Sequence, residues 1–112
     1  MNKEIKQYNK QQIKYIETTI QDYLANKIPI DQLVNNLEIS IYNMKKYPKK
    51  IITKLISLWG ILEEFYAWML DQNRTALTLQ EQAKIKKVLI KINFLILQYK
   101  EKYLSNSEDH CN

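Results

Sequence analysis

Apolar residues recur every three or four positions along most of the chain, which is the spacing of one face of an α-helix. In the first segment the apolar stripe consists of Ile13, Ile16, Ile20, Tyr23 and Leu24. A helix over about 4–25 is therefore expected. Its end falls at Asn26, a residue type that tolerates the left-handed conformation of a helix terminus.

Three further helices are predicted by the same spacing. The second runs over about 30–46 and starts behind Pro29, because proline suits the beginning of a helix, and Tyr47-Pro48 closes it. The third runs over about 49–72. The fourth runs over about 79–104, where Thr78 and Glu81 have the spacing of a capping box.

Short connections between long helices favour antiparallel neighbours. The expected fold is all-α: a single-domain, up-down antiparallel four-helix bundle over residues 1–104. A short polar tail, 105–112, follows it.

The segment 79–104 carries apolar residues on two sides. One stripe comprises Ile85, Leu89, Ile92, Ile96, Tyr99 and Tyr103, and the other comprises Ala83, Ile90, Phe94 and Leu97. A helix that is apolar on two sides is usually buried between neighbours. Alternatively, the second stripe meets a partner, or a second copy of the chain through the Phe94 side.

The scarcity of certain residues argues against an enzyme and against a metal or cofactor site. The chain has one Gly, one His and one Cys. Gly-rich phosphate loops, His- or Cys-based catalysis and structural zinc sites all need more of these residues. His110 and Cys111 lie in the polar tail. Glu63 and Glu64 are adjacent, so on a helix their side chains diverge by about 100° instead of converging as an acid/base pair.

The net charge of +5 is unevenly distributed. Residues 59–83 carry one arginine against four carboxylates, a net −3, whereas residues 84–104 carry six lysines and one glutamate, a net +5. The densest basic cluster, at the junction of the second and third helices, consists of Lys45, Lys46, Lys49, Lys50 and Lys54. With Tyr42 and Tyr47 close by, it is either a solvated helix junction or a surface for nucleic acid.

The outer side of the third helix is the candidate partner-binding surface. It combines a tryptophan, three carboxylates and two small residues: Trp68, Glu63, Glu64, Asp71, Ser57 and Gly60. Tryptophan is enriched at interaction hot spots. A glycine inside a helix costs stability and often lets another chain come close. The alternative is that Trp68 covers the edge of the core and the carboxylates are merely solvated.

Two segments resemble a known family when taken together. One is Ile28-Pro29-Ile30-Asp31-Gln32-Leu33-Val34-Asn35-Asn36-Leu37-Glu38, and the other runs from Leu58-Trp59-Gly60 through Glu63-Glu64 to Asp71. The pair is similar to small all-helical bacterial proteins, some of which resemble immunity proteins of polymorphic toxins, including contact-dependent growth inhibition systems. Pro29 replaces the capping serine typical of that pattern, and the basic fourth helix departs from it.

The resemblance implies an immunity protein that binds a cognate toxin domain, such as a nuclease, and covers its active site or substrate-binding surface. A cytoplasmic location is expected because the first residues have no apolar core of a secretory signal. The alternative function is a small basic nucleic-acid-binding or regulatory protein. No membrane association is expected, because the longest uncharged apolar stretches, 55–62 and 92–99, are far shorter than the ~20 residues that span a bilayer.

Overall fold

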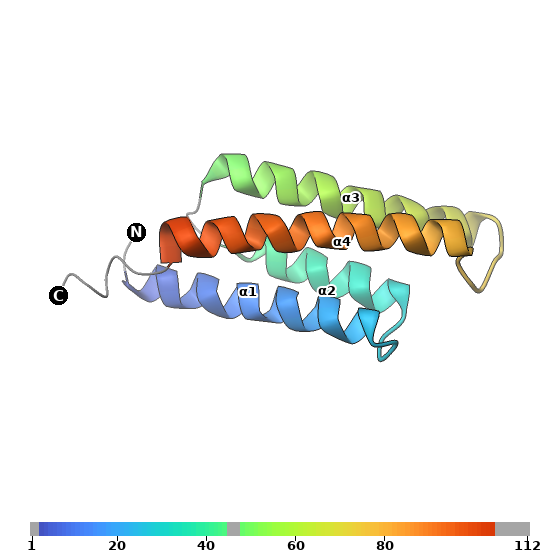
Figure 1. The fold of residues 1–112 in the computed structure, drawn as a ribbon, viewed down its shortest axis with the longest axis horizontal. Helices are drawn as coiled ribbons and strands as arrows, with labels where there is room; N and C mark the ends of the chain where they lie inside the picture. Colours follow the sequence, from blue (N-terminus) through green and yellow to red (C-terminus); the bar gives the residue numbers. More distant parts are fainter. Residues whose placement is uncertain (1–2, 45–47, 105–112) are drawn as a thin grey trace.

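Four helices and a terminal helical turn make up the fold. A computed structural model describes residues 3–44 and 48–104, the last of these for its backbone alone. The elements are α1 (Lys3–Leu24), α2 (Ile30–Tyr42), α3 (Lys49–Asp71), α4 (Leu79–Tyr99) and the π-helical turn η1 (Lys100–Leu104). Each helix runs opposite to the one before it, and α4 returns against α1 (Figure 1). The predicted all-α, up-down four-helix bundle is thus confirmed.

The second helix is shorter than predicted. It ends at Tyr42, because the backbone N–H of Met44 bonds to the carbonyl of Ile41 and tightens the chain into a turn. The expected helical stretch up to residue 46 is therefore wrong at Asn43 and Met44. Met44 still packs into the core from this turn, so its apolar character agrees with the stripe although its backbone does not. Lys45, Lys46 and Tyr47 lie outside the described residues.

The fourth helix is not a uniform α-helix to its end. Its last five residues form η1, in which a wider turn replaces the α-helical one. The rings of Tyr99 and Tyr103 lie 5.3 Å apart across this change, and both pack against the core. The apolar spacing predicted the helical course, while the switch in turn type depends on this packing.

The residues that begin and end the helices adopt conformations typical of their residue types. Asn26 and Asn73 adopt the left-handed conformation (φ 61° and 56°) just after α1 and α3. Pro29 is the N-cap of α2, so it stands immediately before the first helical residue and not inside the helix. Thr78 and Glu81 form the predicted capping box at the start of α4.

The core is mostly aliphatic, and a few polar side chains, Asn9 among them, are buried with it. Eighteen buried apolar residues, mostly Ile and Leu contributed by all four helices and the turn after α2, form a single cluster. One buried hydrogen bond joins the first and the last helix: the amide of Asn9 in α1 donates to the hydroxyl of Tyr99 in α4 at 3.0 Å, and both residues are 0% exposed.

Candidate functional site

The predicted partner-binding residues lie on the outer side of α3. Ser57, Glu63, Glu64, Trp68 and Asp71 are exposed, and Gly60 is half-buried. Steps of three and four residues place all of them except Glu63 along one stripe, which we call the α3 face together with Glu63 at its edge. The α3 face is accessible, and no other helix of the described chain covers it.

The two tryptophans of α3 have different roles. Trp59 points towards α2, where its indole N–H donates to the carbonyl of Val34 at 2.9 Å and its ring meets Tyr42 edge-on at 6.1 Å. Trp68 is 54% exposed, and its indole N–H has no hydrogen-bond acceptor among the described residues. Covering the edge of the core therefore accounts for Trp59 but leaves more than half of Trp68 in solvent.

The carboxylates of the α3 face carry uncompensated charge. Within residues 3–44 and 48–104, Glu63, Glu64 and Asp71 take part in no ion pair. The nearest arginine in sequence, Arg74, is engaged elsewhere, because its guanidinium binds both oxygens of Glu81 at 2.8 Å. The guanidinium and the Thr78 backbone N–H lower the pKa of the Glu81 carboxyl to about 2.

Gly60 lies in the middle of α3 without a steric reason in the chain. A Cβ built on it would meet nothing within 4 Å. Its φ is also not positive, so the backbone conformation does not call for glycine. The expected close approach at Gly60 is therefore not made by any other part of the described chain.

The alternative basic patch is only partly described. Lys49, Lys50 and Lys54 at the start of α3 are exposed, whereas Lys45 and Lys46 lie outside the described residues. Of the two tyrosines expected beside them, Tyr47 also lies outside, and Tyr42 is exposed with its ring edge-on to Trp59.

The second apolar stripe of α4 faces solvent. Ile90 is 66% exposed, Phe94 59% and Leu97 49%, and Ala83 is exposed as well. The interpretation of this segment as a helix buried on both sides is therefore wrong. It fails because the helices that contact α4, chiefly α3 and less so α1, leave this side open, and no further helix among the described residues covers it.

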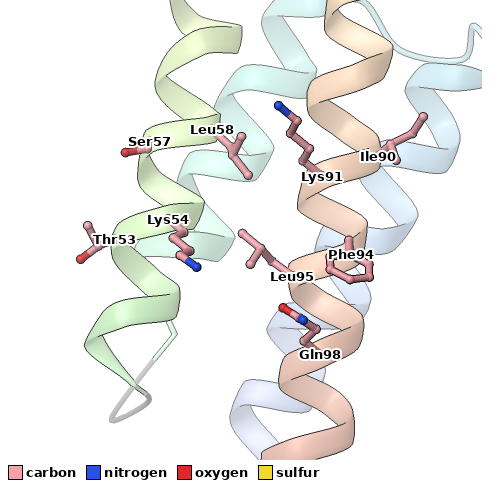
Figure 2. A pocket seen from close by; sticks show the side chains of 9 residues that line it. All are labelled: Thr53, Lys54, Ser57, Leu58, Ile90, Lys91, Phe94, Leu95 and Gln98. Atoms are coloured by element: carbon pink, nitrogen blue, oxygen red, sulfur yellow. The ribbon is translucent and has the colours of Figure 1, made fainter.

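A hollow of about 640 Å³ lies between α3 and α4, beside this stripe. Figure 2 shows Leu58 and Leu95 pointing into the space between the helices, with Lys54 and Lys91 reaching in from opposite sides. Thr53, Ser57, Ile90, Phe94 and Gln98 complete its lining. A second hollow of about 470 Å³ shares Lys54, Leu95 and Gln98 with the first and extends to Pro48, Lys50, Ile51, Glu101, Lys102 and Tyr103.

The two hollows adjoin at these three shared residues, and we call them together the α3–α4 groove, which the sequence alone did not predict. One residue could have indicated the groove: Leu95 is apolar but belongs to neither stripe of α4. In the structure it is half-buried and lines the groove. Which α3 residues lie opposite depends on the register of two helices, and periodicity does not specify this.

Groups for metal binding do not come together in the part of the chain that the structure describes: no cluster of three or more His, Cys, Asp or Glu residues has the required proximity. His110 and Cys111 lie outside that part. None of the described helices combines the length and the apolar character needed to cross a bilayer.

Comparison with known proteins provides no family for this chain: no family model, no curated protein and no solved structure matches it.

Proposed function

We propose that this chain is an immunity-type protein that binds a toxin domain through the α3 face and blocks its active site or substrate access. The observation that carries the proposal is Trp68, a 54% exposed indole on a helix face with three carboxylates; neither its N–H nor these carboxylates have a partner among the described residues. Desolvating such a side chain in a partner's pocket is the usual source of hot-spot binding energy.

Two further features support a protein partner for the α3 face. Gly60 leaves space beside α3 that no side chain of the described residues fills. Glu63, Glu64 and Asp71 offer carboxylates to a partner's basic groups, as inhibition of a nuclease with a basic cleft would require. The resemblance of residues 28–38 and 58–71 to immunity proteins of polymorphic toxins suggests which kind of partner this is.

The test pairs the chain with the C-terminal domain of a toxin encoded directly upstream of its gene. Co-expression with the chain should restore growth of cells that make this domain. By calorimetry, Trp68→Ala and Glu64→Lys should each weaken the complex by about 2 kcal/mol or more, roughly 30-fold in Kd.

Matched controls are available on α1 and α2. Tyr15→Ala removes an aromatic side chain of similar exposure from α1, and Glu38→Lys reverses an exposed charge on α2. Both controls should leave the affinity unchanged. Equal affinity in all four variants would exclude the α3 face, and failure of the wild-type chain to protect cells would exclude the function.

A second candidate function is nucleic-acid binding at the basic junction. It is favoured by one observation: Lys50, Lys54 and Lys102 come from two helices to line the same hollow. This function requires binding to a DNA or RNA oligonucleotide that falls linearly with salt on a log–log scale. The absence of a gel shift at low salt would exclude it.

A further inference from the structure

The exposed stripe of α4 and the groove beside it form a second surface, which shares only Ser57 with the α3 face. Ile90, Phe94 and Leu97 leave about half or more of their side-chain area in solvent. Leu58 and Leu95 continue this apolar surface inward to the groove floor. An exposed apolar strip that runs into a groove is typical of a docking site.

The dimensions of the groove suit a helix. It follows α4 from Ile90 to Tyr103, a distance of about 20 Å at 1.5 Å per residue. A partner helix of about 13 residues, or three to four turns, has the same length. The groove is open instead of enclosed, because Lys54, Lys91, Phe94 and Gln98 at its sides are all exposed, which disfavours a small molecule.

The charge around the groove selects an acidic occupant. Lys50, Lys54, Lys91 and Lys102 line it, against the single carboxylate of Glu101. Lys54 and Lys91 take part in no ion pair with any described residue. The ammonium group of Lys102 lies 5.6 Å from the centre of the Tyr103 ring. Lys102 also forms no ion pair with any described residue.

The same charges disfavour two other occupants. A second copy that inserted its own α4 and η1 would bring a segment with six lysines, residues 84–102, against these lysines. Nucleic acid would satisfy the charge but would leave Ile90, Phe94 and Leu97 facing phosphates and sugars. An apolar floor between lysines instead matches a helix with an apolar stripe flanked by carboxylates.

We propose that the α3–α4 groove binds an acidic amphipathic helix of a protein partner, with that helix's apolar side chains on Phe94, Leu58 and Leu95 and its carboxylates at Lys54 and Lys91. The groove lies beside the α3 face and adjoins it at Ser57, but this proposal stands independently of the toxin complex. It requires only that the partner present such a helix.

The test uses a fluorescein-labelled synthetic 14-residue helical peptide. Its Leu and Phe residues are spaced i, i+3, i+4, i+7 and i+11, and Glu fills most of the remaining positions. Two controls are a peptide of the same composition with scrambled spacing and one with Lys in place of Glu. Fluorescence anisotropy should show binding of the first peptide at least tenfold tighter than of either control, with a Kd that rises with salt.

Variants locate the binding site. Phe94→Asp and the double variant Lys54→Glu/Lys91→Glu should each weaken peptide binding at least tenfold. Their matched controls, Ile39→Asp on α2 and Lys10→Glu/Lys14→Glu on α1, should leave it unchanged. Trp68→Ala should also leave it unchanged, which separates this site from the α3 face. Because all these side chains are exposed, circular dichroism should show the same fold in each variant.

Several outcomes would overturn the proposal. Equal binding of the scrambled peptide, or no binding of the acidic peptide up to millimolar concentration, would exclude an acidic amphipathic helix as the ligand of the groove. Displacement of the peptide by a DNA or RNA oligonucleotide with at least tenfold higher affinity would assign the groove to nucleic acid. Self-association in light scattering that Phe94→Asp abolishes would assign the surface to a second copy.

Discussion

Glu81 combines two structural roles in one carboxylate. It closes the capping box by accepting from the Thr78 backbone N–H at 2.8 Å, and it also receives both bonds of the Arg74 guanidinium. The capping role was predicted from the spacing of Thr78 and Glu81. The Arg74 contact was not, because Arg74 precedes the helix by five residues and its placement depends on the left-handed turn at Asn73.

The first prediction concerns the pH dependence of this carboxylate. Because the pKa of Glu81 falls from 4.5 to about 2 on folding, the unfolded chain takes up the proton first as the pH decreases. The stabilisation is therefore complete above pH 4.5 and is lost between 4.5 and about 2. Glu81→Gln should lower Tm at neutral pH.

Thermal unfolding at several pH values checks this prediction. The difference in Tm between wild type and Glu81→Gln should shrink as the pH falls through that window. Glu38→Gln on α2 is the control, since Glu38 makes no ion pair among the described residues, and its Tm difference should stay near zero throughout. A gap for Glu81→Gln that is independent of pH would contradict the proposed bonding.

At the scale of the helix, α3 serves two purposes with opposite faces. Leu55, Leu62 and Met69 on its inner side belong to the core. Its outer side carries Gly60 at a central position, where a helix-forming residue would be expected from propensity alone. A conflict of this kind, between local preference and fold, commonly marks a site with a function.

The second prediction follows from the open space at Gly60. Gly60→Ala should stabilise the protein by about 1 kcal/mol, because alanine has the better helix propensity and its Cβ would meet no atom within 4 Å. Denaturant unfolding provides the measurement. If the toxin domain packs on the α3 face as proposed, the same variant should bind it more weakly although it is more stable.

The reverse change in the same helix is the control. Ala67 is exposed in α3, so Ala67→Gly should destabilise by a similar amount. A loss of stability in Gly60→Ala would mean that the space beside this residue is occupied, contrary to the structure.

The helices were largely predictable from apolar spacing, because each stripe that faces the core repeats every three or four residues. The exposure of Ile90 and Phe94 was not predictable, since periodicity identifies an apolar stripe but does not show whether another helix covers it. The groove could not be predicted from the sequence either, because Lys54 and Lys91 come together only when α3 packs on α4. The residues of the α3 face were predicted to lie on the outer side of this helix, and all but the half-buried Gly60 are exposed, but their role as a binding site stays a prediction.

At the scale of the whole molecule, the net charge of +5 hides two surfaces of opposite sign. The α3 face carries Glu63, Glu64 and Asp71, while the α3–α4 groove carries lysines from both helices. Because α3 borders both surfaces, a bundle of four helices can offer a basic and an acidic site without a second domain. This separation depends on the bundle keeping a single arrangement of α4 relative to α3 and α1.

The third prediction concerns one of the contacts between α1 and α4. The Asn9–Tyr99 hydrogen bond joins residues 90 positions apart and closes the ring of helices between α1 and α4. Tyr99→Phe keeps the ring but takes an acceptor from the fully buried Asn9 amide, which should cost roughly 1–2 kcal/mol. Urea unfolding should show this loss, whereas Tyr103→Phe, four residues on and half-buried, should show almost none.

The same variant also tests whether the groove depends on the closed ring. Tyr99 and Lys102 flank the point where α4 passes into η1, and Lys102 lines the groove. If the Asn9–Tyr99 bond fixes the rotation of this segment, Tyr99→Phe should change the amide signals of η1 and of the groove in NMR spectra while those at Trp68 stay in place. Unchanged signals in η1, together with unchanged stability, would mean that apolar packing alone sets the position of α4.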